Sequence, residues 1–476
     1  MSAESVDVSP HSVVNVDTVV NSARVSKTAI AVIILCGCIM LLDGYDFGIV
    51  SNASPLMIKE WNVNTAQFGI VFSVATFGWM IGAIVFGGIS DRIGRKKTLI
   101  IGAAIFTVGT LFVMFTHSVD QISIVRFISG IGVGGAVPVA MVLTSEFSPE
   151  KSRAKFVTIM FSGFVIGQTL GAYIAAAMMP VFGWRSLFLL GFIVPAIIIV
   201  VIAFFLPESA RWLVLHEQGG KNRPALEKIC KRIDPSLQID ANTEFVAVVE
   251  KKDKGHLKDL FEGRFKYVTP LLWLWYLCSS LGLFFIQSWL PQILVLKGLT
   301  AAHASAMVGT AGLFGIAGTI LVGFYLDKAG FKWGFLWPLV AIVCIVCIGG
   351  VSATAMVLFW ICANGLFMNG GHSILTAFVP NVYPVKIRAQ GSGVANAIAR
   401  IGSIIGPYIG GVLIAMGMPM NHLFYLIAIP FVLAAGLAAF QGRQYDNYFA
   451  PLYRGQLADT SATDDKVVAS VQTPAA

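Results

Sequence analysis

The sequence predicts an all-α integral membrane protein whose twelve transmembrane helices form two pseudo-symmetric halves of six. The first observation is composition, because 56% of the 476 residues are hydrophobic and only 12% are charged. Soluble domains typically carry about 25% charged residues. The second observation is a series of twelve apolar runs, and the third is a repeat that relates the first six runs to the last six. This composition excludes a disordered chain, a disulfide scaffold, a coiled coil and an ordinary soluble enzyme.

Each predicted span is close to the length of about 20 apolar residues that a bilayer requires. The spans are 28–50, 65–88, 98–116, 121–144, 154–179, 184–206, 267–291, 304–326, 334–351, 353–379, 390–415 and 420–441. They define a first half at 28–206 and a second half at 267–441, separated by a polar central loop at 207–266. Polar tails at 1–27 and 442–476 flank the two halves. The first run is too long and too interrupted by charge for a cleaved signal peptide.

Basic residues are distributed unevenly between the two sides of this predicted bundle. With the N-terminus placed in the cytoplasm, the outer loops contain only Lys59, Arg185 and Lys297, and most other Lys and Arg residues fall in cytoplasmic segments. Basic loops stay on the cytoplasmic side of a membrane. Both tails and the central loop are therefore predicted to be cytoplasmic, and the protein to reside in the cell inner (plasma) membrane. The net charge of +8 reflects this topology and not a nucleic-acid partner.

The loops of the two halves repeat each other. Gly, Asp, a basic residue, Gly and Lys recur at an offset of 236 between the loop at 87–97 and the loop at 323–332. A second set of matches, at an offset of 235, relates Pro149, Lys151, Arg153 and Ala154 to Pro384, Lys386, Arg388 and Ala389. Two six-helix halves related in this way are the plan of secondary transporters, which bind their cargo between repeats.

Three short motifs resemble those of a known family. The loop at 88–97 reads GISDRIGRKK and resembles the most typical signature of the major facilitator superfamily. The segment at 207–213, PESARWL, resembles a signature shared with sugar porters. Residues 43–46 read DGYD and resemble the DGxD signature of the aromatic acid:proton symporters. The resemblance covers roughly residues 28–441 and implies transport of benzoate-type, hydroxybenzoate-type or muconate-like acids.

The resemblance also implies functional residues. Asp43 and Asp46 match the carboxylates of the DGxD motif that transport requires, and Asp91 matches the loop aspartate. Functional charges of the family fall at the positions of Arg126, Glu146, Arg388 and Arg400. The loop of the second half is degraded, because Phe331 replaces a common basic residue, and this weakens the assignment of Asp327 and Lys332.

Charged residues within the spans indicate where transport chemistry takes place. A charge at the centre of a transmembrane helix costs at least about 2.5–3.5 kcal/mol, so Asp43, Asp46, Arg126 and Arg400 are expected to serve transport or to pair. Asp43 and Asp46 are three residues apart and share one helix face. Repulsion and burial favour the neutral acid in at least one of them, which predicts proton coupling. The alternative is a permanent ion pair with Arg126.

Arginine side chains suit a carboxylate substrate because the guanidinium group presents planar pairs of donors. Arg400 lies deep in its span and is favoured as the substrate anchor. Arg126 lies nearer the outer end of its span, where a side chain that extends to the interface is the alternative. Further candidate substrate contacts, each with helix packing as the alternative, are Tyr45, Phe285, Trp289, His372 and Asn396.

Opposite charges gather at the predicted cytoplasmic ends of the spans. We expect them to form ion pairs in one conformation and to break them in another, with Asp91 pairing in the outward-open state. A role in topology alone is the alternative. The gating candidates are Asp91, Arg92, Arg95, Glu146, Arg153, Asp327 and Arg388.

Two other motifs are explained by packing. Residues 130–135 read GIGVGG and imitate a dinucleotide fingerprint, but no strand precedes them. Small residues here, and at Gly78, Gly82, Gly402 and Gly406, are expected to let helices approach closely. The Cys344 and Cys347 pair has no second pair and no nearby His, so we expect no metal, no disulfide framework and no cofactor besides the coupled proton.

The combined prediction is a monomeric symporter that imports a small aromatic carboxylate with protons by alternating access. The alternatives are a carrier of other organic acids, a sugar porter, an exporting antiporter, and a receptor that binds aromatic acids without transport. An enzyme is least favoured, because no nucleophile–base set or metal cluster is evident in the sequence.

Overall fold

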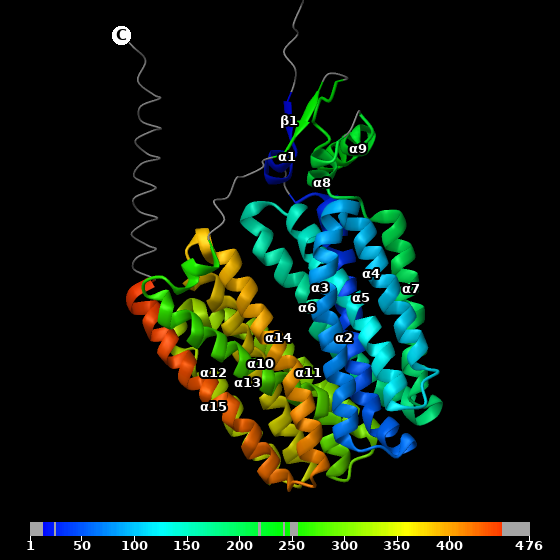
Figure 1. Ribbon diagram of the computed structural model, residues 1–476, viewed down its shortest axis with the longest axis vertical. Coiled ribbons are helices and arrows are strands. Elements are labelled where there is room, and N and C mark those ends of the chain that lie inside the picture. The colour runs from blue at the N-terminus through cyan, green and yellow to red at the C-terminus, as the bar shows by residue number, and fades with distance from the viewer. Residues whose placement is uncertain (1–12, 23–24, 218–219, 241–242, 248–255, 450–476) are drawn as a thin grey trace, which may run out of the picture. The chain divides into compact units, whose positions relative to one another are not determined.

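The computed structural model describes residues 13–22, 25–217, 220–240, 243–247 and 256–449. This part of the chain is almost entirely helical (Figure 1), and it contains twelve helical segments long and apolar enough to cross a membrane. These helices are α2 (Lys27–Trp61), α3 (Thr65–Ile93), α4 (Arg95–Val113), α5 (Val119–Glu146), α6 (Arg153–Phe182), α7 (Arg185–Phe205), α10 (Phe265–Leu296), α11 (Ala301–Ala329), α12 (Leu336–Gly350), α13 (Thr354–Val382), α14 (Val385–Ala415) and α15 (Met420–Gln444). The predicted twelve-span fold is therefore confirmed.

Local capping sets several helix ends. The Ser26 side chain accepts a hydrogen bond from the backbone N–H of Ala29 at the start of α2. Asn62 ends that helix in the left-handed conformation, with φ of 52°. Asn64 and Gln67 then form a reciprocal capping box that starts α3. These polar contacts satisfy backbone groups that the helix ends leave without intrahelical partners.

Helices α2 and α6, and helices α3 and α5, cross where glycines face the partner backbone. A Cβ atom at Gly44 of α2 would overlap the carbonyl oxygen of Phe164 in α6, and one at Gly134 of α5 would overlap that of Trp79 in α3. Gly82 faces the carbonyl of Ile131 in the same way. Only glycine allows so close an approach, which confirms that the small residues of 130–135 serve helix packing.

A small extramembrane cap lies beside the N-terminal ends of α2 and α4 and was not predicted. It consists of β1 (Val13–Asn15), α1 (Val16–Ser22), α8 (Ala210–Leu215), α9 (Arg223–Ile233) and β2 (Glu244–Val246). The two strands pair in parallel, with Val14 opposite Phe245. Val16, Val19 and Ile229 are buried in the same apolar cluster as Leu99 of α4. Hydrophobic burial thus attaches the N-terminal segment and part of the central loop to the bundle.

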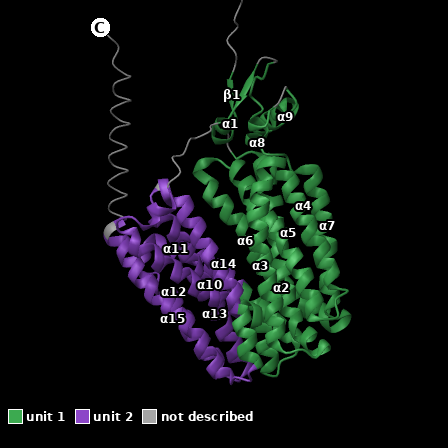
Figure 2. Ribbon diagram, viewed as in Figure 1, with its two compact units in different colours: residues 1–251, 287–312, 407–415 green, residues 252–286, 313–406, 416–476 purple. Residues whose placement is uncertain are grey.

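The chain divides into two compact units (Figure 2). Unit 1 comprises residues 1–251, 287–312 and 407–415, and unit 2 comprises residues 252–286, 313–406 and 416–476. Unit 1 includes parts of α10, α11 and α14, and side chains of α2 and α3 form hydrogen bonds to α10 and α14. The Ser51 hydroxyl donates to the Gln287 carbonyl at 2.7 Å, and the Thr65 hydroxyl donates to the Gly411 carbonyl at 2.9 Å. This division differs from the halves at 28–206 and 267–441, which stay a prediction based on the repeat.

Candidate functional site

A buried ion pair joins α2 and α5 inside unit 1. Asp46 is 4% exposed and Arg126 is 6% exposed. Arg126 Nη1 donates to Asp46 Oδ2 at 2.5 Å, and the Thr110 hydroxyl of α4 donates to Asp46 Oδ1 at 3.0 Å. Each carboxylate oxygen therefore has a donor, which matches the ionised acid. Arg126 does not extend to a membrane interface, because its guanidinium group is engaged within the bundle.

This ion pair distinguishes the surroundings of the two motif carboxylates. The sequence left open whether an acid of the DGxD motif forms a fixed ion pair with Arg126, and the structure places Asp46 in that pair. Tyr45 lies between Asp43 and Asp46 in the sequence. Its side chain points toward α7, where its hydroxyl donates to the Leu187 carbonyl at 3.0 Å. Asp46 binds Arg126 Nη1, whereas Arg126 Nε is buried without a hydrogen-bond partner among the described residues. A substrate-binding role for Arg126 stays a prediction.

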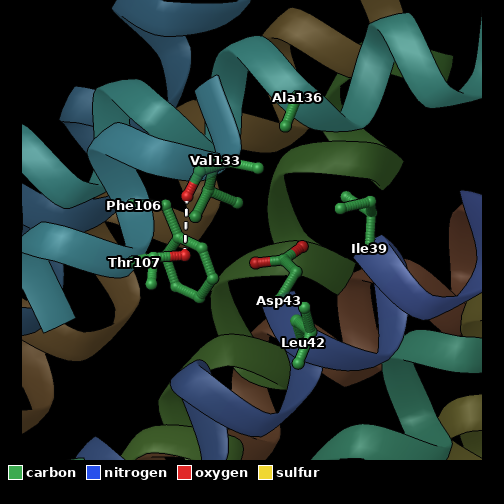
Figure 3. A pocket seen from close by; sticks show the side chains of 8 residues that line it. Ile39, Leu42, Asp43, Phe106, Thr107, Val133 and Ala136 are labelled. Carbon is green, nitrogen blue, oxygen red and sulfur yellow. Dashed lines mark hydrogen bonds between the residues drawn. The ribbon is translucent and has the colours of Figure 1, made fainter. Parts of the chain in front are cut away.

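Asp43 lies one turn earlier on α2 and lines a small cavity (Figure 3). The cavity has a volume of about 10 Å³, which is room for one water molecule. The walls come from α2, α4 and α5, and the lining residues are Ile39, Leu42, Asp43, Ala103, Phe106, Thr107, Val133 and Ala136. The wall is therefore apolar apart from the Asp43 carboxyl group and the Thr107 hydroxyl. Asp43 itself is half-buried.

The predicted gating residues form a network at the turn between α3 and α4. Arg95 Nη2 lies 2.9 Å from Asp91 Oδ1, and Arg95 Nε lies 3.9 Å from Glu146 Oε1 on α5. Glu208 was not predicted here, yet its carboxylate accepts from the backbone N–H groups of Arg95 at 2.9 Å and Lys96 at 3.1 Å. A carboxylate at a helix N-terminus satisfies free N–H groups and opposes the helix dipole. The start of α4 is therefore tied to the segment that follows α7.

The remaining gating candidates are more exposed. Arg92 is exposed beside this network. Arg153 is exposed and lines a polar pocket of about 60 Å³ together with Glu146 and the cap residue Asp17. In unit 2, Asp327 is exposed, and the Arg388 guanidinium donates to the Tyr383 carbonyl at 3.3 Å. Their gating roles stay predictions.

Unit 2 brings His372 of α13 together with residues of α10 and α14. His372 Nδ1 lies 3.1 Å from the Ser279 hydroxyl, and the Tyr276 ring meets the imidazole edge-on with centroids 6.4 Å apart. The Arg400 guanidinium is close enough to act electrostatically on His372. Arg400 itself is half-buried. The two candidate substrate contacts predicted for α13 and α14 are thus within electrostatic range of each other, and His372 also meets Ser279 and Tyr276, which were not predicted as substrate contacts.

The other predicted substrate contacts have separate surroundings. Trp289 is fully buried in unit 1, where its indole N–H donates to the Pro407 carbonyl at 2.7 Å and its ring meets Phe72 edge-on. Phe285 is 2% exposed. Asn396 is exposed, and its amide donates to the Ser392 carbonyl at 2.9 Å. Trp289 therefore contributes to contacts between helices in this conformation.

Two threonines of α4 were missed in the sequence, although their spacing gave a usable signal. Thr107 and Thr110 are three residues apart, as Asp43 and Asp46 are, and α4 carries no ionisable residue from 98 to 113. Thr107 shares the cavity of Asp43, and Thr110 bonds to Asp46. Within the described residues, no group of three or more His, Cys, Asp or Glu side chains could hold a metal ion.

Comparisons with known proteins agree on one family. A family model described as Major Facilitator Superfamily matches residues 36–363 and 298–448. The 4-hydroxybenzoate transporter of Acinetobacter baylyi is 33% identical over 434 residues, covering 88% of this chain and 92% of that protein. A gallate transporter of Pseudomonas putida is 32% identical over 415 residues, covering 86% of this chain and 90% of that protein.

Solved structures with the same fold include two transporters. A bacterial homologue of the human lysosomal transporter Spinster, in an inward-facing and unoccupied conformation, matches with a TM-score of 0.69 at 15% identity, covering 88% of this chain and 98% of that chain. A D-xylose–proton symporter matches with a TM-score of 0.66 at 17% identity, covering 87% and 97%. The family consists of membrane transporters and not of enzymes. The chain therefore belongs to the Major Facilitator Superfamily, and its relatives over most of its length include transporters of aromatic acids.

Proposed function

We propose that this protein is a proton-coupled symporter that imports a small aromatic carboxylate, such as benzoate or a hydroxybenzoate, across the inner membrane. Relatives about 30% identical over most of the chain are transporters of 4-hydroxybenzoate, gallate and benzoate. The observation that carries the proposal is that two neighbouring acids have different surroundings. Asp46 is held by Arg126, whereas Asp43 lines an apolar cavity.

Asp43 is the proton carrier in this proposal. Ionising a carboxyl group in an apolar cavity is unfavourable, so binding a proton there removes a desolvation cost. The Asp46–Arg126 pair is already neutral overall and has donors on both carboxylate oxygens. We therefore assign the pair to holding α2, α4 and α5 together, and Asp43 to exchanging the proton.

Arg400 is the proposed anchor of the substrate carboxylate. Its guanidinium can form two parallel hydrogen bonds with such a group, and His372 lies in the same cluster. A bound anion neutralises Arg400, and a bound proton neutralises Asp43. Alternating access would then carry both inward together, with the network of Asp91, Arg95 and Glu146 opening and closing one end. Both termini are proposed to be cytoplasmic and the protein to be a monomer.

Proteoliposomes with an imposed pH gradient test this proposal. Radiolabelled 4-hydroxybenzoate should accumulate when the exterior is acidic, and Asp43→Asn should abolish that accumulation. Arg400→Ala should raise the half-saturation concentration at least tenfold, whereas Arg443→Ala, at an exposed arginine of the same half, should leave it unchanged. Undiminished gradient-driven accumulation in Asp43→Asn would refute the assignment of the proton site.

Competition decides the substrate class. Unlabelled benzoate, hydroxybenzoates and gallate should each reduce uptake of the labelled acid, and D-xylose should not. Inhibition by xylose with no inhibition by aromatic acids would favour the sugar-porter alternative, which the segment at 207–213 resembles.

A further inference from the structure

We propose that Asp446, just past the end of α15, is a positioning residue that clamps the turn between α11 and α12 to the last helix of the second half. The Asp446 carboxylate accepts a hydrogen bond from the backbone N–H of Lys332 at 3.2 Å. The clamp makes this turn move together with α15 when the transporter changes conformation. This inference rests on the proposed alternating-access cycle, and it gives the end of the last helix a role in transport.

The first support is a matching contact in unit 1. Glu208 lies just past the end of α7, and its carboxylate accepts from the backbone N–H groups of Arg95 and Lys96 in the turn between α3 and α4. Lys332 corresponds to Lys96 at the offset of 236 that relates the two loops. In each predicted half, an acid that follows the last helix therefore binds the backbone at the same position of the repeated turn.

The second support is a glycine that both turns contain. Gly94 and Gly330 correspond at the same offset, and both have a positive φ, of 103° and 74°. A Cβ atom at Gly94 would overlap the Glu208 carboxylate, and one at Gly330 would lie only 3.1 Å from Asp446 Oδ2. Glycine in this conformation thus lets a carboxylate approach the backbone of each turn.

The third support is the way in which the motif of the second half differs from that of the first. In the first half, Arg95 Nε lies 3.9 Å from Glu146 Oε1 on α5. In the second half, Phe331 stands at the position of Arg95, and Asn381 stands at the position of Glu146 at the offset of 235. The basic residue and this acidic partner are thus replaced together, so a different contact must hold the second turn.

Aromatic packing supplies that contact at the end of α15. The Phe331 ring meets the rings of Tyr445 and Phe378 edge-on, with centroids 5.2 and 5.1 Å away. A Cβ atom at Gly442 would overlap the Phe331 carbonyl, so α15 lies directly against the backbone of the turn. These contacts place Asp446, the neighbour of Tyr445, beside the turn that it binds.

The clamp matters for transport because alternating access requires the helices of each half to move as one body. A hydrogen bond to an ionised carboxylate is stronger than one between neutral groups, so Asp446 holds the turn firmly to α15. The clamp belongs to this turn and to the end of α15, whereas the candidate substrate contacts of unit 2 belong to α10, α13 and α14. Its loss should therefore slow the conformational change and leave substrate affinity unchanged.

Hydrogen exchange at the Lys332 amide tests the contact itself. Mass spectrometry of the purified protein in detergent compares this amide in the wild type, Asp446→Ala and Asp446→Asn. Alanine removes the acceptor, so exchange of the amide should become at least about tenfold faster. Asparagine retains a carbonyl oxygen that can accept the bond and should restore most of the protection. Unchanged exchange in Asp446→Ala would overturn the inference.

Initial rates of 4-hydroxybenzoate uptake into proteoliposomes test the role of the clamp in transport. In Asp446→Ala, the maximum rate should fall about three- to tenfold, and the half-saturation concentration should stay within about twofold of the wild-type value. Asp446→Asn should recover most of the rate. A normal maximum rate despite faster exchange, or a raised half-saturation concentration without loss of rate, would overturn the positioning role.

Asn447→Ala is the matched control. Asn447 is the next residue along the chain and is exposed, so its replacement should change neither the exchange of the Lys332 amide nor the uptake rate. An equal loss of rate in Asn447→Ala would show that any change in this segment disturbs transport, and would overturn the inference. If Asp446→Ala does not fold, Asp446→Ser carries both measurements, because its hydroxyl is one bond too short to replace the carboxylate.

Phe331→Arg is a second probe of the same clamp. It introduces the residue type of the first-half motif but removes the ring that meets Tyr445, so the Lys332 amide should exchange faster and uptake should slow. A protected amide in this variant would overturn the argument that aromatic packing positions Asp446. Absence of gradient-driven uptake in the wild type would refute the proposed function itself, whereas normal wild-type uptake with an unaffected Asp446→Ala would refute only the clamp.

Discussion

Replacing Arg126 with leucine is expected to destabilise the protein strongly. The change removes the donor at 2.5 Å from Asp46, and the two side chains of the pair are only 8% and 5% exposed. Asp46 would keep Thr110 as a partner but would lose its counter-charge. Breaking a buried ion pair by removing one partner costs about 3–5 kcal/mol, because an uncompensated charge stays buried. The free energy of unfolding, from denaturant titration in detergent followed by tryptophan fluorescence, should fall by that amount.

The double variant Asp46→Asn with Arg126→Leu separates charge from packing. Asparagine is neutral and can still accept from Thr110, so the double variant should recover roughly 1–3 kcal/mol relative to the sum of the single changes. Arg443→Leu, at an exposed position of α15, should change stability by less than about 0.5 kcal/mol. The reasoning is refuted if Arg126→Leu resembles that surface control, or if the double variant loses as much as both single changes added together.

Three further predictions concern packing and the cap. Gly134→Leu should abolish the folded, monodisperse peak in size-exclusion chromatography, because its Cβ would overlap the Trp79 carbonyl, whereas Gly87→Ala should be tolerated, because no atom lies within 4 Å. Val16→Asp should lower the melting temperature and speed proteolysis of the cap, because Val16 is 2% exposed in the cluster that attaches it. Burial raises the pKa of Cys230 to about 11, so little reactive thiolate forms at pH 8. A variant with Cys230 as its sole cysteine should therefore react slowly with a maleimide until Val16→Asp or denaturant exposes it.

Hydrophobicity and motif spacing in the sequence predicted the spans, the family and the identity of the buried charges. The choice between Asp43 and Asp46 as the partner of Arg126 could not be predicted, because it depends on how α2 is rotated and shifted against α5. A three-residue shift along α2 would exchange the two acids without changing any sequence pattern. The strand at Val13–Asn15 was missed for a different reason. Three residues are too few to show an alternating pattern, and their partner at Glu244–Val246 is far away in the chain.

The role of the close-packed glycines, in contrast, could be predicted from the sequence. The residues at 130–135 and Gly82 were predicted to pack helices together, and the backbone carbonyls of Trp79 and Ile131 lie against them. The partner helix was not predictable, but the need for a small side chain was, since glycine at helical spacing has few other uses inside a membrane. A local requirement for a small side chain can thus be predicted from the sequence, whereas the register between two helices can be determined only from the folded structure.

The fixed partnership of Asp46 and Arg126 leads to a prediction about stoichiometry. With Asp46 bound to Arg126 throughout the cycle, the proton carrier that we propose is Asp43 alone, so each cycle should carry one proton with one monoanion. That cargo is electroneutral, and a potential of 100 mV, interior negative, should leave accumulation in proteoliposomes unchanged. A second proton carried by Asp46 would add one net charge, worth about 2.3 kcal/mol at 100 mV, or roughly a fiftyfold increase in the accumulation ratio. Potassium gradients with valinomycin impose this potential at constant pH, and a fiftyfold response would show that Asp46 leaves Arg126 during the cycle and also carries a proton.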